Sequence, residues 1–317
     1  MIFRRLRAKG VLALNGRNGA LIAAYNPRAL YPIVDDKLLT KDLAARHGVP
    51  APELYGELRT PHDVRRLPEI VADHPSFVIK PASGSGGDGI VVIDSHRNGR
   101  YRTCSGVLLD QDDLTHHVAN ALNGQYSLGG HPDRVMIEYR VHFDPLFDRV
   151  CHQGVPDIRI IVFLGYPVMS MVRLPTWASD GKANLHQGAV GAGICLATGL
   201  TIDGVLGDIR TQEHPDTGES VVGIRIPGWA RILEMAASCY EMTGLGYLGV
   251  DLVLDAKLGP LMLELNARPG LNIQIANGVG LVPRLEHVKA ICDKVRGPAE
   301  RVALMREHLA RPAPAAA

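Results

Sequence analysis

The sequence predicts an α+β fold, because its strand segments come in adjacent pairs and its helical segments lie between those pairs. Residues 77–93, 156–174 and 249–272 each contain two mainly apolar segments separated by a loop that contains glycine. Two strands joined by a short loop pair antiparallel, whereas parallel strands need a crossover of about a dozen residues or more. Helical periodicity is clearest over residues 228–244, which end at a glycine. We therefore expect antiparallel sheets with separate helices packed on them.

Length and composition exclude several classes of protein. The chain has 317 residues, enough for two or three subdomains around one cleft, and its formal net charge of +1 attracts neither nucleic acid nor membrane. The five cysteines follow no paired spacing, which fits a reducing cytoplasm better than disulfides or a zinc site. No apolar run approaches the ~18 residues of a membrane span, and no secretory signal is present. We expect a cytoplasmic protein with no transmembrane segment and no nucleic-acid partner.

The two ends of the chain differ from the rest. Residues 1–17 carry basic side chains and no acidic one, which predicts a solvated surface, with a membrane or partner contact as the alternative. Residues 311–317 are mainly proline and alanine and are expected to be disordered.

Two lysines stand near the start of the first predicted helix. Residues 35–44 begin with two aspartates and stop before Gly48, so Lys37 falls in the first turn and Lys41 one turn later. Taken alone, either is an ordinary surface lysine. A second amphipathic helix is predicted over 61–74, with a proline near its start.

The next segment predicts a phosphate-binding loop. A strand over 77–81 ends with a lysine, a run rich in glycine and serine follows, and a second strand occupies 90–93. Glycine permits positive φ angles, so successive N–H groups can surround phosphate oxygens. A hairpin loop without a ligand is the alternative, but the lysine favours phosphate. The candidate residues are Lys80, Ser83, Gly84, Ser85, Gly86, Gly87 and Gly89.

A helix is predicted over 110–121 and a strand over 134–141, in which Glu138 follows three apolar residues. Glu138 lies where a linker between two lobes would present backbone groups to an adenine edge. Taken alone, it is an acid at a strand end.

Two arginines lie in the predicted hairpin 156–174. Arg159 and Arg173 have apolar neighbours, which favours arginines aimed at a ligand over solvated ones. A polar run, 182–188, then leads into a glycine-rich strand. Its His186 fits a structural histidine better than a catalytic base.

Residues 249–272 carry the strongest signal for chemistry. Asp251 stands on one strand, and Glu264 and Asn266 share a face of the next. Carboxylate and amide oxygens, together with a substrate phosphate, suit Mg²⁺. Arg268 adds a cation close by. The alternative is a set of polar residues on a solvated hairpin face.

Further expectations concern packing in this region. The turn of the hairpin is expected at Gly259-Pro260, and Leu263 and Leu265 are expected to point into the core. Residues 283–296 and 298–310 are predicted closing helices.

Taken in order, these residues resemble the ATP-grasp ligase superfamily, and in particular the alpha-L-glutamate ligase-like relatives of ribosomal protein S6 glutamate ligase. The resemblance covers about residues 32–295. The residues that carry it are Lys37, Lys80 with its glycine loop, Glu138, Arg159, Arg173, the run 182–188, Asp251 and the run 264–270.

The resemblance implies an ATP-grasp fold of two lobes whose antiparallel sheets hold ATP. It implies a basic extension over 1–36, a lid lobe over 37–141, a metal-binding lobe over 142–297, and a closing helix and tail over 298–317. Lys37 and Lys80 would contact the ATP phosphates, and 83–89 would cover them. The adenine would lie at Glu138, Tyr139 and Val141, and Asp144 is a weaker candidate for the ribose.

For the reaction, the resemblance implies ATP-dependent joining of a carboxylate to an amine through an acyl phosphate, adding glutamate or another amino acid. Asp251, Glu264 and Asn266 would bind two Mg²⁺ ions, with Mn²⁺ as a substitute, and Arg268, Arg159 and Arg173 would bind the acid. A phosphotransferase and a nucleotide-binding regulatory module are the alternatives.

One departure from the family concerns the acceptor site. Family members usually carry an α/β domain before the first lysine, and only 36 residues precede Lys37. A partner subunit or a second copy of the chain is therefore one way to complete the acceptor site.

Overall fold

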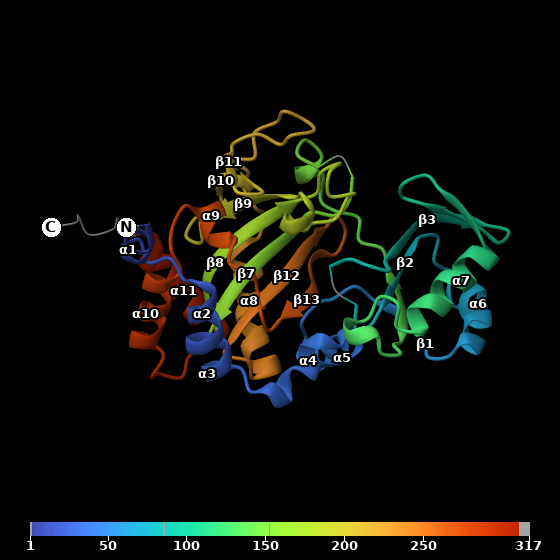
Figure 1. Cartoon of the computed structure of the whole chain (residues 1–317), viewed down its shortest axis with the longest axis horizontal. Helices are drawn as coiled ribbons and strands as arrows, with labels where there is room; N and C mark the ends of the chain where they lie inside the picture. Colours follow the sequence, from blue (N-terminus) through green and yellow to red (C-terminus); the bar gives the residue numbers. More distant parts are fainter. Residues whose placement is uncertain (1, 85, 152, 311–317) are drawn as a thin grey trace. The chain divides into compact units, whose positions relative to one another are not determined.

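A computed structural model describes residues 2–84, 86–151 and 153–310 (Figure 1). The predictions for Ser85 and for the tail 311–317 lie outside the described residues. The chain forms two compact units. The six-stranded unit comprises 35–42 and 51–142, and the seven-stranded unit comprises the described residues of 1–34, 43–50 and 143–317. The strands pair antiparallel in both units, which confirms the α+β prediction.

The six-stranded unit is one antiparallel sheet with helices. Its strand order is β1-β6-β2-β3-β4-β5. The strands are β1 (Leu54–Leu58), β2 (Phe77–Pro81), β3 (Val91–Arg97), β4 (Arg100–Thr103), β5 (Leu108–Asp110) and β6 (Val135–Tyr139). The predicted strands around the glycine loop are β2 and β3. Strands β1, β4 and β5 were not predicted.

Helix α7 (Gln111–Leu122) packs on this sheet and begins at a capping box. The Asp110 carboxylate accepts from the Asp113 N–H at 2.9 Å, and the Asp113 carboxylate accepts from the Asp110 N–H at 3.0 Å. Apolar side chains of α7 and the sheet form one buried cluster, including Phe77, Ile79, Leu114 and Val118. Strands β2 and β3, which flank the glycine loop, are therefore fixed by this core.

The predicted helix 61–74 is shorter and has two parts. A 3-10 helix, η3 (Pro61–Arg66), is followed by α6 (Leu67–Ile70). Pro68 lies at this junction, where it cannot donate to a preceding turn, and the helical segment ends at Ile70.

The seven-stranded unit contains the hairpins 156–174 and 249–272. Its strand order is β11-β10-β9-β8-β7-β12-β13, and the central strands lie side by side in Figure 1. The strands are β7 (Asp157–Phe163), β8 (Tyr166–Leu174), β9 (Val190–Ile194), β10 (Thr201–Leu206), β11 (Ile209–Thr211), β12 (Tyr247–Asp255) and β13 (Gly259–Asn266). The β10–β11 hairpin was not predicted.

Both faces of this sheet are buried. Helix α8 (Trp229–Thr243) packs on one face against side chains such as Ile160 and Val250. On the other face, Phe163 and Tyr247 pack with Leu21 and Ile22 of the N-terminal segment. Helices α9 (Ile273–Asn277), α10 (Val282–Ile291) and α11 (Pro298–Ala310) complete the unit. Among the described helices, none has the length and apolar character needed to cross a bilayer.

The N-terminal segment is an integral part of the seven-stranded unit. It contains α1 (Ile2–Ala8), α2 (Leu14–Gly16), a π-helix η1 (Arg17–Ile22), α3 (Ala23–Tyr25), a 3-10 turn η2 (Arg28–Leu30) and the start of α4 (Pro32–Asp35). The Asn26 side chain donates to the carbonyls of Tyr247 and Ala267, at 2.6 and 3.0 Å, and accepts from the Tyr247 N–H at 2.9 Å. These bonds join the segment to β12 and to Ala267, the residue that follows β13.

The last hairpin differs from its prediction in two details. Its turn precedes Gly259, because the Asp255 carboxylate accepts from the N–H groups of Lys257 and Leu258 and strand pairing resumes at Gly259. A register shift between Asp251 and Leu252 leaves Leu263 as an extra residue on β13. Leu263 is therefore half-buried, while Leu265 lies in the core as expected.

Two further helices form where they were predicted but with different bounds. Helix α5 (Lys37–Arg46) begins after Asp36, whose carboxylate accepts from the N–H of Leu38 at 3.0 Å. Helix α10 ends at Ile291, several residues before the predicted end at 296.

Candidate functional site

Two arginines and two aspartates form a buried network on one face of the seven-stranded sheet. Asp251 of β12 pairs with Arg159 of β7, and Asp157 of β7 pairs with Arg173 of β8. Arg159 Nε donates to Asp251 Oδ1 at 2.5 Å, and its Nη2 donates to Oδ2. Arg173 Nη2 donates to Asp251 Oδ2 at 2.8 Å, and Arg173 also binds both oxygens of Asp157. The structure thus brings together three residues that the sequence singled out, and adds Asp157.

The pKa values of the two aspartates are shifted in opposite directions. For Asp251, burial favours the protonated form, but the charges of Arg159 and Arg173 outweigh it and lower the pKa. For Asp157, burial is the largest effect and raises the pKa to about 6, although the Arg173 charge acts in the opposite direction. Asp251 is therefore held as a carboxylate, whereas Asp157 titrates within reach of neutral pH.

The predicted metal ligands lie on β12 and β13. Glu264 faces Asp251 across the strand pair, and Asn266 Nδ2 donates to Asp251 Oδ2 at 3.2 Å. Glu264 is half-buried and has no hydrogen bond or ion pair within the described residues. A half-buried carboxylate without a partner is unfavourable unless a cation neutralises it. This donor set of carboxylate and amide oxygens fits Mg²⁺ or Mn²⁺.

The metal would still need ligands beyond the acidic side chains. No group of three or more His, Cys, Asp or Glu residues in the described chain is arranged to hold a metal. The amide oxygen of Asn266, water and a substrate phosphate would therefore complete the shell, as is usual for Mg²⁺. Glu264 is available for such a role, whereas both oxygens of Asp251 already accept hydrogen bonds.

Arg268 lies just after β13 and is exposed. Its guanidinium lies over the ring of Tyr31, 5.2 Å from the centroid. The segment that carries it is held by the N-terminal region, because Arg17 Nη1 donates to the Pro269 carbonyl at 3.0 Å and Asn26 donates to the Ala267 carbonyl. Sequence reasoning missed this support, because nothing in residues 1–30 indicates which late segment they contact.

In the six-stranded unit, two lysines share one buried glutamate. Lys80 of β2 pairs with Glu138 Oε1, and Lys41 of α5 lies 2.9 Å from Glu138 Oε2. Burial raises the pKa of Glu138, but the charges of Lys80 and Lys41 outweigh it and lower that pKa. Lys41 has only 15% of its side chain exposed, so it is not the surface lysine that the sequence suggested. Its spacing of one helical turn from Lys37 was the signal that could have identified it.

The glycine loop is fixed at its base. Lys37 Nζ donates to the Gly84 carbonyl, and the Lys37 N–H donates to the Ala82 carbonyl at 3.0 Å. The Ser83 N–H donates to both oxygens of Asp133, at 2.9 and 3.2 Å. The φ angles are +68° at Gly86, +83° at Gly87 and +74° at Gly89. Residues other than glycine rarely adopt such positive values.

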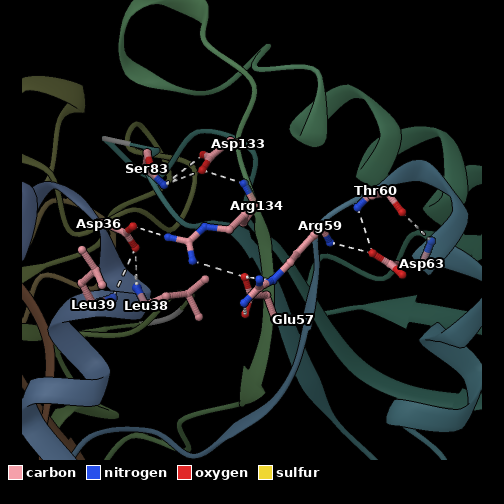
Figure 2. Close-up of polar contacts among 10 residues, drawn as sticks. All are labelled: Asp36, Leu38, Leu39, Glu57, Arg59, Thr60, Asp63, Ser83, Asp133 and Arg134. Carbon is pink, nitrogen blue, oxygen red and sulfur yellow. Dashed lines mark hydrogen bonds and ion pairs between the residues drawn. The ribbon is translucent and has the colours of Figure 1, made fainter.

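Figure 2 shows how carboxylates tie this loop base to the start of α5. Arg134 follows Asp133 and pairs with Asp36, the residue before α5, and with Glu57 of β1 at 3.3 Å. Glu57 also pairs with Arg59 at 2.9 Å. Asp133 and Arg134 were not identified from the sequence, because an Asp-Arg pair before a strand carries no local signature.

The remaining predicted nucleotide contacts occupy defined positions. The Tyr139 N–H donates to the Glu53 carbonyl at 2.8 Å, and Val141 is buried. In the seven-stranded unit, Asp144 Oδ1 accepts from the Leu146 N–H at 2.8 Å, which caps the turn η5 (Pro145–Phe147). Their contacts with adenine and ribose remain predictions.

Comparison with known proteins gives one family and several distant relatives. Residues 16–290 match the family described as sugar-transfer associated ATP-grasp. A probable alpha-L-glutamate ligase of Parasynechococcus marenigrum is 24% identical over 247 residues, covering 78% of this chain and 39% of that protein. A ribosomal protein bS6–L-glutamate ligase of Salmonella paratyphi B is 25% identical over 251 residues, covering 79% and 61%. The chain therefore spans 39% to 61% of the length of these relatives.

Among solved structures, a D-alanine–D-alanine ligase from Bacillus anthracis is 15% identical with a TM-score of 0.46, covering 88% of this chain and 70% of that one. The ATP-grasp ligase PsnB with a minimal precursor is 16% identical with a TM-score of 0.47, covering 84% and 63%. Structural similarity at these identities and TM-scores adds no evidence to the family match.

Proposed function

Because the chain belongs to the sugar-transfer associated ATP-grasp family, we propose that it is an ATP-dependent and Mg²⁺-dependent ligase that joins a carboxylate to an amine. The observation that carries this proposal is the unpartnered Glu264 carboxylate opposite Asp251, on a sheet that also carries two partly buried arginines. This set provides oxygen ligands for a cation and guanidinium groups for an acid.

The proposed reaction has two steps. An oxygen of the acid attacks the γ-phosphorus of ATP, the bond to the β-phosphate oxygen breaks, and ADP leaves with an acyl phosphate formed. The amine then attacks the acyl carbon and loses a proton, phosphate leaves, and an amide remains. Bound Mg²⁺ supplies charge neutralisation at the phosphates. Most of the catalysis is then positioning and charge stabilisation, so no side-chain nucleophile is needed.

The chain's residues divide these tasks. Lys37, Lys80 and the loop 83–89 bind phosphate oxygens, and Glu138 holds Lys80 in place. Tyr139 and Val141 are the proposed adenine contacts, and Asp144 the ribose contact. Glu264, Asp251 and Asn266 are the proposed ligands of two metal ions. Arg268, Arg159 and Arg173 are proposed to bind the acid and the charge that develops on it.

The names of the curated relatives support an amino acid as one substrate. Both relatives are named as L-glutamate ligases, so we propose glutamate as the first amine to test, with other amino acids next. The acid is proposed only by chemical class. A partner subunit or a second copy of the chain that completes the acceptor site also remains a proposal.

The test is a single-turnover reaction with ATP labelled on its γ-phosphate, Mg²⁺, pools of carboxylic acids and hydroxylamine. We expect an acid-dependent hydroxamate formed in step with ADP and labelled inorganic phosphate, and an amide when glutamate replaces hydroxylamine. A stable product that retains the label would indicate a phosphotransferase instead. Tight ATP binding with no ADP formed across all acid pools would indicate a regulatory module.

A further inference from the structure

The negative charge of Asp251 is already shared by two arginines. Its two oxygens accept from Arg159 Nε, Arg159 Nη2, Arg173 Nη2 and Asn266 Nδ2. Three of these donors bind Oδ2 and only Arg159 Nε binds Oδ1, so Oδ1 keeps one lone pair, on a carboxylate that two guanidinium groups already neutralise. If Asp251 binds a metal ion, as the proposed function requires, the positive charges of the ion and of the two guanidinium groups repel one another, which favours release of one arginine.

The two arginines differ in the carboxylate partners that they retain after such a release. Arg173 also binds both oxygens of Asp157, which is buried on β7. Arg159 has Asp251 as its one bonded carboxylate within the described residues. If Asp251 turns away, Arg173 therefore remains paired and Arg159 loses its counter-ion.

We propose that Asp251 exchanges Arg159 for Mg²⁺, and that the released Arg159 guanidinium then binds the carboxylate of the acid substrate, while Asp157 keeps Arg173 in position. This inference rests on the proposed function and assigns different tasks to the two arginines. Arg159 is the acid-binding residue. Asp157 is a positioning residue that acts through Arg173.

The exchange couples metal binding to acid binding. A buried guanidinium without a counter-ion is strongly unfavourable, because it has left water without gaining a partner. An acid carboxylate can accept two parallel N–H bonds from the guanidinium and thereby replace the lost carboxylate of Asp251. Since coupling between two sites is reciprocal, Mg²⁺ raises the affinity for the acid and the acid raises the affinity for Mg²⁺. Without Mg²⁺ the acid has to compete with Asp251 for Arg159.

The test needs no knowledge of the acid. Phenylglyoxal modifies guanidinium groups that are not held in ion pairs, and peptide mass spectrometry identifies each modified arginine. The full-length protein is treated alone, with ADP, with MgCl₂, and with both. We expect MgCl₂ to raise the modification rate of Arg159 by roughly tenfold, with or without ADP, and to leave Arg173 unchanged.

Variants of three aspartates separate this exchange from a general loosening of the protein. In Asp157→Asn, Arg173 loses its second carboxylate, so both arginines should become reactive when MgCl₂ is added. In Asp251→Asn, Arg159 should be reactive without Mg²⁺ and indifferent to it. Asp255→Asn is the matched control, because Asp255 is also buried on β12 but bonds the turn after the strand. It should reproduce the wild-type pattern.

The outcomes distinguish this inference from the proposed function. Calorimetry measures ADP binding with and without MgCl₂ on the same preparation. If Mg²⁺ strengthens ADP binding but Arg159 stays protected, or if both arginines of the wild-type protein become reactive together, the exchange is overturned and the proposed ligase is not. If Mg²⁺ has no effect on ADP binding, the metal site itself is wrong, and both proposals fail.

Discussion

Glu264 and Asp251 face each other across the β12–β13 pair, yet arginines neutralise only Asp251. The two carboxylates therefore have different availability for a cation. Glu264 can bind one without breaking any contact in the described chain, whereas Asp251 already pairs with two arginines. This asymmetry leads to a prediction for Glu264.

Glu264→Gln should remove most of the effect of Mg²⁺ on nucleotide binding. We expect the Mg²⁺-dependent gain in affinity for a non-hydrolysable ATP analogue to fall by roughly tenfold or more, because a neutral amide is a weak ligand for Mg²⁺. The melting temperature should stay the same or rise, since an unpartnered half-buried charge is removed. Calorimetry and thermal unfolding measure these effects. Glu286→Gln, an exposed glutamate on α10, is the control that should change neither.

Asp157→Asn should change how stability depends on pH. The pKa of Asp157 is raised in the folded protein, from 3.8 to about 6, so the folded state holds the proton more tightly than the unfolded state. The contribution of Asp157 to stability is then present below pH 4 and lost as the pH rises to 6. Because the Asp157→Asn variant lacks this loss, its free energy of unfolding should increase with rising pH, relative to that of wild type, by up to about 3 kcal/mol over that range. Urea unfolding at intervals between pH 4 and pH 7 measures it, and equal slopes for both proteins would contradict the assignment.

Lys41→Met should weaken ATP binding, although the sequence alone suggests that Lys41 is an ordinary surface lysine. Glu138 would lose one of its two lysines, which leaves one oxygen of a buried carboxylate unpaired and disturbs Lys80 on the other. We expect about 3 kcal/mol of lost stability and roughly tenfold weaker nucleotide binding. The double substitution Lys41→Met with Glu138→Gln should recover stability but not nucleotide affinity. Lys294→Met, at an exposed lysine, should match wild type.

Asp133→Ala should loosen the glycine loop at its base. The Ser83 N–H would lose both carboxylate acceptors, so its amide hydrogen should exchange with solvent at least about tenfold faster. Hydrogen exchange read by mass spectrometry on peptides covering 80–84 measures this effect. Asp73→Ala, at an exposed aspartate elsewhere in the same unit, should leave the exchange rate unchanged. Protection equal to wild type in Asp133→Ala would show that the carboxylate does not fix the loop.

Much of the fold could be predicted because it depends on local patterns. Short, mainly apolar segments identified the strands beside Lys80, Arg159 and Asp251, and a terminal glycine identified the end of α8 at Gly244. The prediction of the hairpin turn at Gly259 was wrong, because the Asp255 side chain bonds the backbone one step earlier. A glycine marks where a turn is permitted, whereas the capping side chain decides where it forms.

The candidate site was predicted less completely, because burial of a charged residue depends on distant parts of the chain. Lys41 looks like any helix lysine until Glu138, nearly a hundred residues later, is placed beside it. Asp157, at the start of a strand, was not identified as a site residue from the sequence. Its role depends on the hydrogen bond from Arg173 on the neighbouring strand. A sequence pattern shows which face a residue occupies, but it does not show which ion pairs form there.

The side chain of Asn26 has a consequence for how the protein is made. It bonds backbone groups that lie 221 and 241 residues further along the chain. During synthesis on the ribosome, the segment around Asn26 therefore lacks its final partners until residues up to Ala267 have emerged. Closure of such distant contacts is slow, so we expect residues 2–30 to become resistant to protease only after residue 267 has left the ribosome, in a pulse experiment on nascent chains.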